Sequence, residues 1–212
     1  MSVINEIRYI AFEGIVGVGK STQFKLFNSR LRKVWPHGVT ETCEPGGSPI
    51  ADDFRKLVQV TRYEEEMDPV TEQYGYAGSR AQTLRAIVRP ALECGEIVTA
   101  DRSVYSSISY QGFGRGLGVE AVLDINKVAV AGLFPHAALF INTDLDIALP
   151  RAKDKLGDKF ESMGPDFFMK CLEGYKYVKQ NFPNVVEIDG NKSIEEVHEQ
   201  IWTVAMALLK IC

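Results

Sequence analysis

The segment FEGIVGVGKSTQ, residues 12–23, contains three glycines within six residues, followed at once by a lysine and two hydroxyl side chains. It contains the pattern G-x-x-x-x-G-K-[ST], which begins at Gly14 and ends at Ser21. A short apolar run, residues 8–14, leads into it, and residues 21–35 carry apolar side chains at helical spacing. The pattern thus lies between a predicted strand and a predicted helix, which is the context that a phosphate-binding loop (P-loop) requires.

Each part of this loop has a physical reason. Glycine allows the backbone to curl until several N–H groups face one anion, and the N-terminus of the helix adds partial positive charge. Lys20 is predicted to neutralise the outer phosphates of a nucleoside triphosphate, and Ser21 to ligate Mg²⁺. The residues predicted to bind the triphosphate are Gly14, Ile15, Val16, Gly17, Val18, Gly19, Lys20, Ser21 and Thr22.

Strand-like and helix-like segments alternate along the rest of the chain. The expected strands are residues 8–14, the start of 38–47, 96–103, 136–144 and 184–189. The expected helices are residues 21–35, 48–60, 68–95 (bent or ended near Pro90), 118–132, 145–159, 165–181 and 193–210, the last with a capping box of Ser193 and Glu196. This alternation predicts a single α/β domain over residues 1–212, with a five-stranded parallel sheet and helices on both faces. With the P-loop, that is the three-layer P-loop NTPase fold.

Composition narrows the class of protein. The chain has 212 residues and a formal net charge of −4, so a broad basic surface for nucleic acid is not expected. The four cysteines and three histidines lack the spacing of a zinc site, and the cysteines are expected to be free thiols. No apolar run approaches the ~20 residues that span a bilayer. We therefore expect a cytoplasmic protein whose partners are small molecules, with neither nucleic acid nor membrane among them.

Two further clusters follow expected strands. Because ligands bind beyond the carboxyl ends of the strands in such sheets, these clusters are candidate site residues. Asp101 has the position of a carboxylate that holds Mg²⁺, and Arg102 could clamp a phosphate bidentately. The loop Glu44–Ser48 contains two glycines that permit close backbone approach to a ligand, and Arg55 follows one or two helical turns later.

Taken together, these segments resemble the thymidylate kinase family. The stretch YIAFEGIVGVGKST, residues 9–22, resembles its strand and P-loop, and EPGGSPI, residues 44–50, its EPGGT segment. DRSVYSSISYQGFGRG, residues 101–116, is similar to its DR and YQG motifs, and PDFFMKCLEGY, residues 165–175, to the helix after its lid. The similarity spans nearly the whole chain in order, and the combination of EPGG, DR and YQG is more specific than the P-loop alone.

This resemblance implies phosphoryl transfer from ATP to a deoxynucleoside monophosphate, dTMP to dTDP, with Mg²⁺. By position, Arg102 and Arg55 would hold the phosphate of the acceptor, Tyr76 would stack on its base and Arg80 would hydrogen-bond the base edge. Tyr76 and Arg80 are four residues apart and so share one helix face. The residues expected to contact the acceptor are Glu44, Pro45, Arg55, Tyr76, Arg80, Arg102, Ser106, Tyr110 and Gln111.

Residues of about 150–164 resemble the small lid of that family. Closure of a basic lid would expel water and bring positive charge to the moving phosphoryl group. A solvated helix face is the alternative for the same segment, which is richer in lysine than in arginine. The resemblance also implies a homodimer, with residues 118–132 as a candidate interface. The predicted catalytic residues are Lys20, Arg102, Arg151, Lys155 and Lys159.

Two departures from the family pattern keep alternatives open. Val16 occupies a position where the family often has a charged residue near the sugar of the acceptor, and Cys43 replaces the arginine that usually precedes EPGG. Since DRSVYSS also resembles a motif of deoxynucleoside kinases, a nucleoside acceptor is the first alternative. A sugar hydroxyl needs a carboxylate base, for which Glu44 is the candidate. A P-loop module that binds a nucleotide without catalysis is the second alternative, and it leaves Tyr76, Arg80 and Arg102 without a role.

Overall fold

The computed structural model describes residues 7–59, 64–153 and 163–211. Five parallel strands form one sheet in the order β2-β3-β1-β4-β5. Their bounds are β1 Tyr9–Glu13, β2 Val39–Cys43, β3 Ile97–Asp101, β4 Ala137–Asn142 and β5 Val185–Asp189. Each predicted strand is present, and the predicted parallel α/β fold is confirmed.

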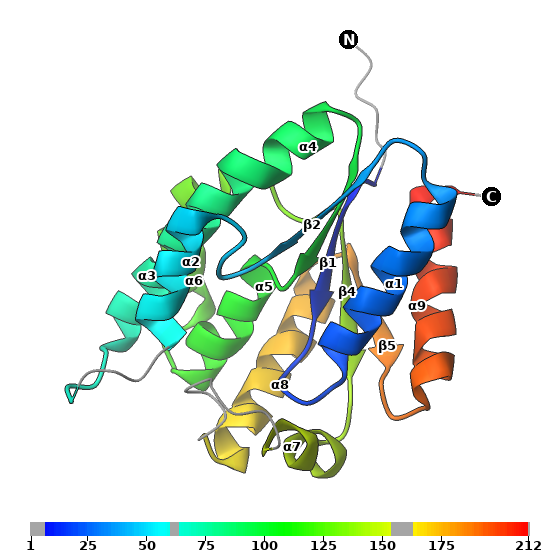
Figure 1. Ribbon diagram of the computed structural model, residues 1–212. Coiled ribbons are helices and arrows are strands. Elements are labelled where there is room, and N and C mark those ends of the chain that lie inside the picture. Colours follow the sequence, from blue (N-terminus) through cyan, green and yellow to red (C-terminus); the bar gives the residue numbers. More distant parts are fainter. Residues whose placement is uncertain (1–6, 60–63, 154–162, 212) are drawn as a thin grey trace.

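Helices cover both faces of the sheet (Figure 1). On one side lie α1 (Lys20–Val34) and α9 (Ile194–Leu209), and α9 begins with the predicted capping box of Ser193 and Glu196. On the other side lie α5 (Val104–Ser107), α8 (Pro165–Asn181) and α4 (Arg89–Glu93), which packs on β1 and β3, while α2 (Pro49–Gln59), α3 (Pro69–Thr83) and α6 (Val119–Val130) lie farther out. The short helix α7 (Leu145–Lys153) lies past the carboxyl end of β4.

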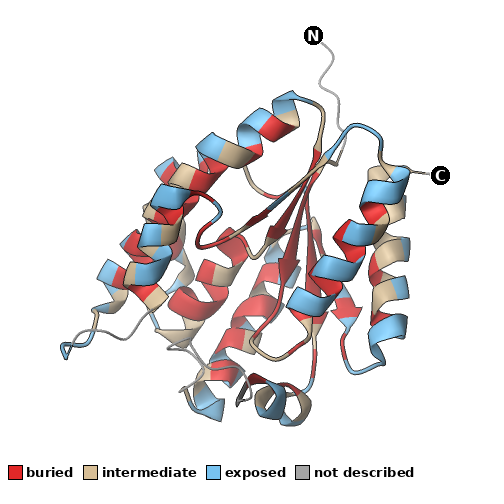
Figure 2. Cartoon of the chain, viewed as in Figure 1, coloured by how far each residue is buried: buried red, intermediate tan, exposed pale blue. Residues whose placement is uncertain are grey.

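The core lies along the central strands, which are buried on both faces (Figure 2). Every residue of β1 is buried, as expected for the middle strand of a parallel sheet. Phe12 contacts Phe27 of α1 with 5.3 Å between ring centroids, and Phe140 stacks on Tyr175 of α8 at 4.7 Å. The sheet is thus fixed between its two helical layers, and the carboxyl ends of β1, β2 and β3 meet at one edge.

The expected helix of residues 68–95 differs from the structure in one respect. Asp68 caps it, α3 runs to Thr83, and a π-helical turn, η1 (Leu84–Val88), follows before α4. Pro90 lies in the first turn of α4. Proline has no N–H to donate and its ring crowds the preceding turn, so the wide turn comes directly before it. The break therefore begins six residues earlier than Pro90, at Leu84.

A second difference is a helical segment that the sequence pattern did not indicate. Ser103 caps α5, which continues into the π-helix η2 (Ile108–Gly114). This segment packs tightly on α8, where a Cβ at Gly174 would lie 2.6 Å from the Cα of Ser109. Its helical form depends on that tertiary contact, which local periodicity cannot show.

One expected helix and one of the four cysteines lie partly or wholly outside the described residues. The helix expected at 145–159 is described as α7 to Lys153, and its remainder lies outside the described residues. Cys43, Cys94 and Cys171 are free thiols, and Cys212 is outside the described ranges. Across residues 7–59, 64–153 and 163–211, no helix has the length and apolar character that a bilayer crossing needs. The assignment of residues 1–212 to one P-loop kinase domain stays a prediction.

Candidate active site

The P-loop connects β1 to α1 at the carboxyl edge of the sheet. Gly17 has a φ of 79°, and a Cβ at this position would lie 1.9 Å from the carbonyl oxygen of Ala148. Only glycine therefore lets the loop pass so close to α7. The first turn of α1 closes on Gly19, whose carbonyl accepts the N–H groups of Thr22 and Gln23. The remaining N–H groups of this turn are available to an anion at the start of the helix.

Lys20 and Asp101 form an ion pair at the mouth of this loop. The parallel register places Asp101 beside Phe12 of β1, so the end of β3 lies against the P-loop. Burial alone would raise the pKa of Asp101, but the positive charges of Lys20 and Arg102 outweigh it and hold that pKa below its ordinary value. Asp101 is thus a stable carboxylate within reach of whatever Lys20 binds.

A cavity opens over this pair. Six of the nine residues predicted to bind the triphosphate line it, namely Ile15, Val16, Gly17, Gly19, Lys20 and Ser21. Gly14, Val18 and Thr22 do not line it, although the carbonyl of Gly14 accepts a hydrogen bond from Arg102 at 2.8 Å. Asp101, Arg102 and Arg55 also line this cavity. The cavity therefore combines loop amides, three cationic side chains and two carboxylates, those of Asp101 and Glu44.

A second cavity adjoins the first. Four residues line both cavities: Val16, Glu44, Gln59 and Arg102. The rest of its wall comes from Pro45, Tyr76, Arg80, Ser103, Ser106, Ser107, Tyr110 and Gln111. All the residues predicted to contact the acceptor thus line this second cavity, except Arg55. Arg55 lines the first cavity, and its Nη1 donates a hydrogen bond to the carbonyl oxygen of Pro45 at 2.8 Å.

Arg102 lies where the two cavities meet. Its backbone has a φ of 77°, the left-handed region that is strained for a residue with a Cβ. Nη1 donates to the hydroxyl oxygens of Ser106, at 3.1 Å, and Tyr175, at 3.3 Å. Nη2 donates to the hydroxyl of Tyr110 at 3.2 Å. The guanidinium is therefore fixed in place by neutral groups, and its charge stays available to an anion.

A buried carboxylate that was not predicted from the sequence lies behind Arg102. Glu13, 1% exposed, accepts hydrogen bonds from Ser103 and Ser106 at 2.6 Å each and from Tyr175 at 2.9 Å. Burial raises the pKa of Glu13, although the three hydroxyls and Arg102 oppose this effect. A charged residue at the end of an otherwise apolar strand was the available signal. Its partner Tyr175 comes from α8, 162 residues away, and carried no signal of its own.

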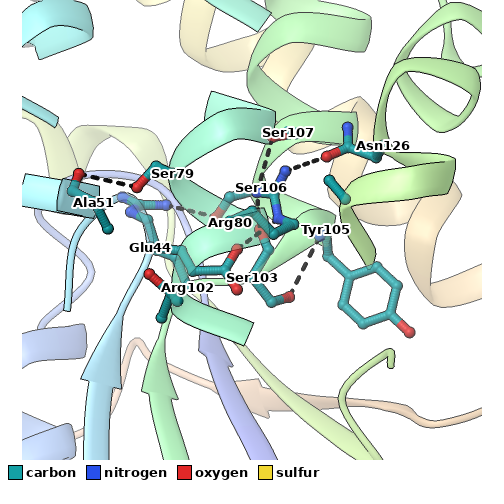
Figure 3. Close-up of polar contacts among 12 residues, drawn as sticks. Glu44, Ala51, Ser79, Arg80, Arg102, Ser103, Tyr105, Ser106, Ser107 and Asn126 are labelled. Atoms are coloured by element: carbon teal, nitrogen blue, oxygen red, sulfur yellow. Dashed lines mark hydrogen bonds and ion pairs between the residues drawn. The ribbon is translucent and has the colours of Figure 1, made fainter. Parts of the chain in front are cut away.

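Arg80 makes four hydrogen bonds to neighbouring residues (Figure 3). Nε donates to Glu44 at 2.6 Å, Nη1 to Asn126, and Nη2 to the carbonyl of Ser103 at 3.3 Å and the hydroxyl of Ser107 at 3.1 Å. A guanidinium has five N–H groups, so these contacts leave one for a ligand. Burial raises the pKa of Glu44, and the charge of Arg80 opposes it. The candidate base Glu44 is thus engaged by Arg80.

The lid residues are only partly described. Arg151 lies exposed on α7 and lines neither cavity, whereas its neighbour Ala152 lines the first one. Lys155 and Lys159 lie outside the described residues. The role of all three stays a prediction.

Comparison with known proteins shows the family of this chain. The sequence model of the family described as thymidylate kinase matches residues 12–201. A thymidylate kinase of Kosmotoga olearia is 37% identical over 204 residues, which cover 95% of this chain and 97% of that protein. A thymidylate kinase of Finegoldia magna is 39% identical over 194 residues, which cover 91% of this chain and 94% of that protein. The match takes in the P-loop, the EPGG loop and both cavities, and the chain belongs to the thymidylate kinase family.

Proposed function

We propose that this protein transfers the γ-phosphoryl group of ATP to dTMP, giving ADP and dTDP. The observation that carries the proposal is the junction of two cavities at Arg102, one built on a P-loop and the other on aromatic and amide side chains. Phosphoryl transfer needs a donor and an acceptor held close and in line, and two adjoining ligand sites that share Arg102 suit that arrangement.

On the donor side, Lys20 would exchange its contact with Asp101 for the outer phosphates of ATP. The hydroxyl of Ser21 and the carboxylate of Asp101 are the oxygen ligands that suit Mg²⁺. Within the described residues no three His, Cys, Asp or Glu side chains gather at one point, which suits an ion held largely by the nucleotide and water. When bound, Mg²⁺ supplies positive charge to the phosphates of the donor.

On the acceptor side, Arg102 and Arg55 would hold the phosphate of dTMP. The ring of Tyr76 would lie against the base, and Arg80 and Gln111 would face its edge. A monophosphate is already anionic near neutral pH, so its attack needs positioning and charge neutralisation rather than a base. Two of the buried carboxylates near this cavity, Glu44 and Glu13, are engaged, the first by Arg80 and the second by three hydroxyls. This favours a monophosphate over a nucleoside as the acceptor.

The lid belongs to the same proposal. Arg151, Lys155 and Lys159 would close over the phosphates, exclude water and add positive charge to the transferring group. The N-terminal half of α7 already contacts the P-loop at Gly17, so a movement of this helix would reach the donor cavity directly.

We also propose a homodimer whose interface uses α6, which corresponds to the expected interface of residues 118–132, together with α3. Val128 of α6 is 78% exposed and Tyr74 of α3 is 60% exposed, and the two helices pack on each other. Large exposed apolar side chains are typical of a contact surface. Light scattering of the purified protein and of Val128→Glu tests this: the variant should be monomeric. A monomeric wild type would contradict the dimer and leave the proposed reaction untouched.

The reaction is tested by incubating the full chain with ATP and Mg²⁺ and each of four acceptors: dTMP, dUMP, dCMP and thymidine. We expect rapid formation of ADP and dTDP with dTMP and none with thymidine. Phosphorylation of thymidine alone would establish a nucleoside kinase instead. Slow hydrolysis of ATP that no acceptor accelerates would establish a nucleotide-binding module.

A further inference from the structure

Glu72 of α3 is a buried carboxylate that the proposed reaction does not use. Its side chain is 0% exposed, and it lines neither cavity. Oε1 accepts a hydrogen bond from Nε2 of Gln111 at 2.8 Å, and Oε2 accepts one from Nη2 of Arg115 at 3.0 Å. These bonds join α3 to the end of η2, directly behind the wall of the acceptor cavity. Burial of a charge is costly, so a carboxylate retained here calls for a function.

The contact with Glu72 fixes the orientation of the Gln111 amide. A carboxylate can only accept hydrogen bonds, so the NH₂ group of the amide must face Glu72. Gln111 lines the acceptor cavity, and its Oε1 has no hydrogen-bond partner among the residues that the structure describes. The amide therefore presents its acceptor atom, and not its donor, to a ligand in that cavity.

Hydrogen-bond donors lie on the neighbouring part of the same wall. The guanidinium of Arg80 has one N–H left after its contacts with Glu44, Asn126, Ser103 and Ser107 (Figure 3). The Ser107 oxygen accepts from Arg80, so its own O–H is directed elsewhere, and Ser107 lines the cavity. The wall thus offers donors from Arg80 and Ser107 and an acceptor from Gln111.

This pattern matches one class of pyrimidine. A 4-keto pyrimidine such as thymine or uracil presents O4, an acceptor, beside N3–H, a donor. Cytosine presents the reverse, an amino group beside an unprotonated N3. A site that leaves its buried polar groups unpaired with the wrong ligand discriminates strongly against it.

We propose that Glu72 is a positioning residue that locks the Gln111 amide so that its Oε1 accepts the N3–H of a 4-keto pyrimidine, while Arg80 and Ser107 face O4. Cytosine nucleotides are excluded because their N3 would meet the lone pairs of Oε1. This inference rests on the proposed function, since it concerns the base of the acceptor. It adds a residue outside the cavity that sets the choice of base.

The first test is Glu72→Gln. Arg115 still requires an oxygen acceptor, so the new amide is expected to turn its oxygen to Arg115 and its NH₂ to Gln111. Gln111 would then flip and place its own NH₂ in the cavity. We expect the ratio of kcat/KM for dTMP to that for dCMP to fall by about tenfold or more, through KM for dTMP, with KM for ATP unchanged. Glu93→Gln, an exposed change on α4, is the matched control and should leave the ratio unchanged.

The second test is Gln111→Leu, which tests the role of the Gln111 amide in the choice of base even if Glu72→Gln does not fold. It removes the amide altogether, so the ratio should fall again, and adding Glu72→Gln to it should have no further effect on the ratio. The inference is overturned if either variant keeps the wild-type ratio, if Glu72→Gln slows both acceptors equally, or if the wild type accepts dCMP as well as dTMP. Each of these results leaves dTMP phosphorylation itself intact, whereas a wild type without any monophosphate kinase activity refutes the proposed function.

Discussion

Nε of Arg80 donates to Oε2 of Glu44 at 2.6 Å, and each of the two side chains is only 2% exposed. This buried ion pair ties α3 to the loop that follows β2, across 36 residues of sequence. It fixes the wall of the acceptor cavity before any ligand arrives. The counter-charge of Glu44, with hydrogen bonds to Asn126, Ser103 and Ser107, also explains how a charged guanidinium can remain buried.

Removing one partner of this pair should be costly. Glu44→Ala leaves the Arg80 charge buried without its counter-ion, and we expect the free energy of unfolding in urea to fall by about 3–5 kcal/mol. The control is Asp53→Ala, which breaks an ion pair with Lys56 whose side chains are 64% and 75% exposed, and which should cost at most about 1 kcal/mol. Equal losses in the two variants would show that the buried pair contributes nothing special.

Lys20→Ala should abolish rapid turnover while the fold survives. The variant removes the positive charge proposed for the outer phosphates of ATP, and kcat should fall by at least about a hundredfold. Lys25→Ala, an exposed change one turn along α1, should retain full activity. Thermal unfolding of both variants checks that they fold. Wild-type turnover in Lys20→Ala would refute the assigned role of the lysine.

Tyr175→Phe should weaken the acceptor site selectively. The hydroxyl donates to Glu13 at 2.9 Å and accepts from Arg102 at 3.3 Å, so its loss frees the guanidinium that is proposed to hold the acceptor phosphate. One lost hydrogen bond of this kind corresponds to an increase in KM for dTMP of several-fold, with KM for ATP unchanged. Tyr177→Phe on the same helix should change neither constant. A parallel rise of both KM values in Tyr175→Phe would point to a general loss of structure instead.

The pH dependence of the free energy of unfolding should reveal the lowered pKa of Asp101. Its pKa is held below the ordinary value of 3.8 by Lys20 and Arg102, against the opposing effect of burial. The unfolded chain therefore binds this proton at a higher pH than the folded chain does. The stabilisation is complete above pH 3.8 and is lost as the pH falls through the lower, folded pKa. Asp101→Asn should accordingly lose less stability than the wild type on acidification from about pH 5 to about pH 2.5, measured by urea unfolding at each pH. Identical losses would contradict the pairing with Lys20.

The elements themselves were largely readable from sequence. The P-loop pattern, the alternation of strands and helices and the capping box at Ser193 are local signals, because they depend on residues within a few positions of one another. All five strands were predicted, with ends that differ from the observed ones by at most a few residues. The two π-helical turns were not predicted, since the wide turn at Leu84 and the tight packing of η2 on α8 leave no simple periodic pattern.

The candidate active site likewise has some features that the sequence predicted and others that only the structure shows. Sequence placed the P-loop, Asp101 and Arg102 at strand ends, and the parallel sheet brings strand ends to one edge wherever it forms. It could not show which side chains pair with which. The Glu44–Arg80 pair, the hydroxyls around Glu13 and the contact of Glu72 with Gln111 join residues that are 36 to 162 positions apart. Only the strand order β2-β3-β1 and the packing of α3, η2 and α8 against it bring these groups within hydrogen-bond distance. Motifs and helix caps depend on residues that are close in sequence, so the sequence shows them directly. Burial and side-chain pairing depend on contacts between distant segments, which form only when the helices pack on the sheet.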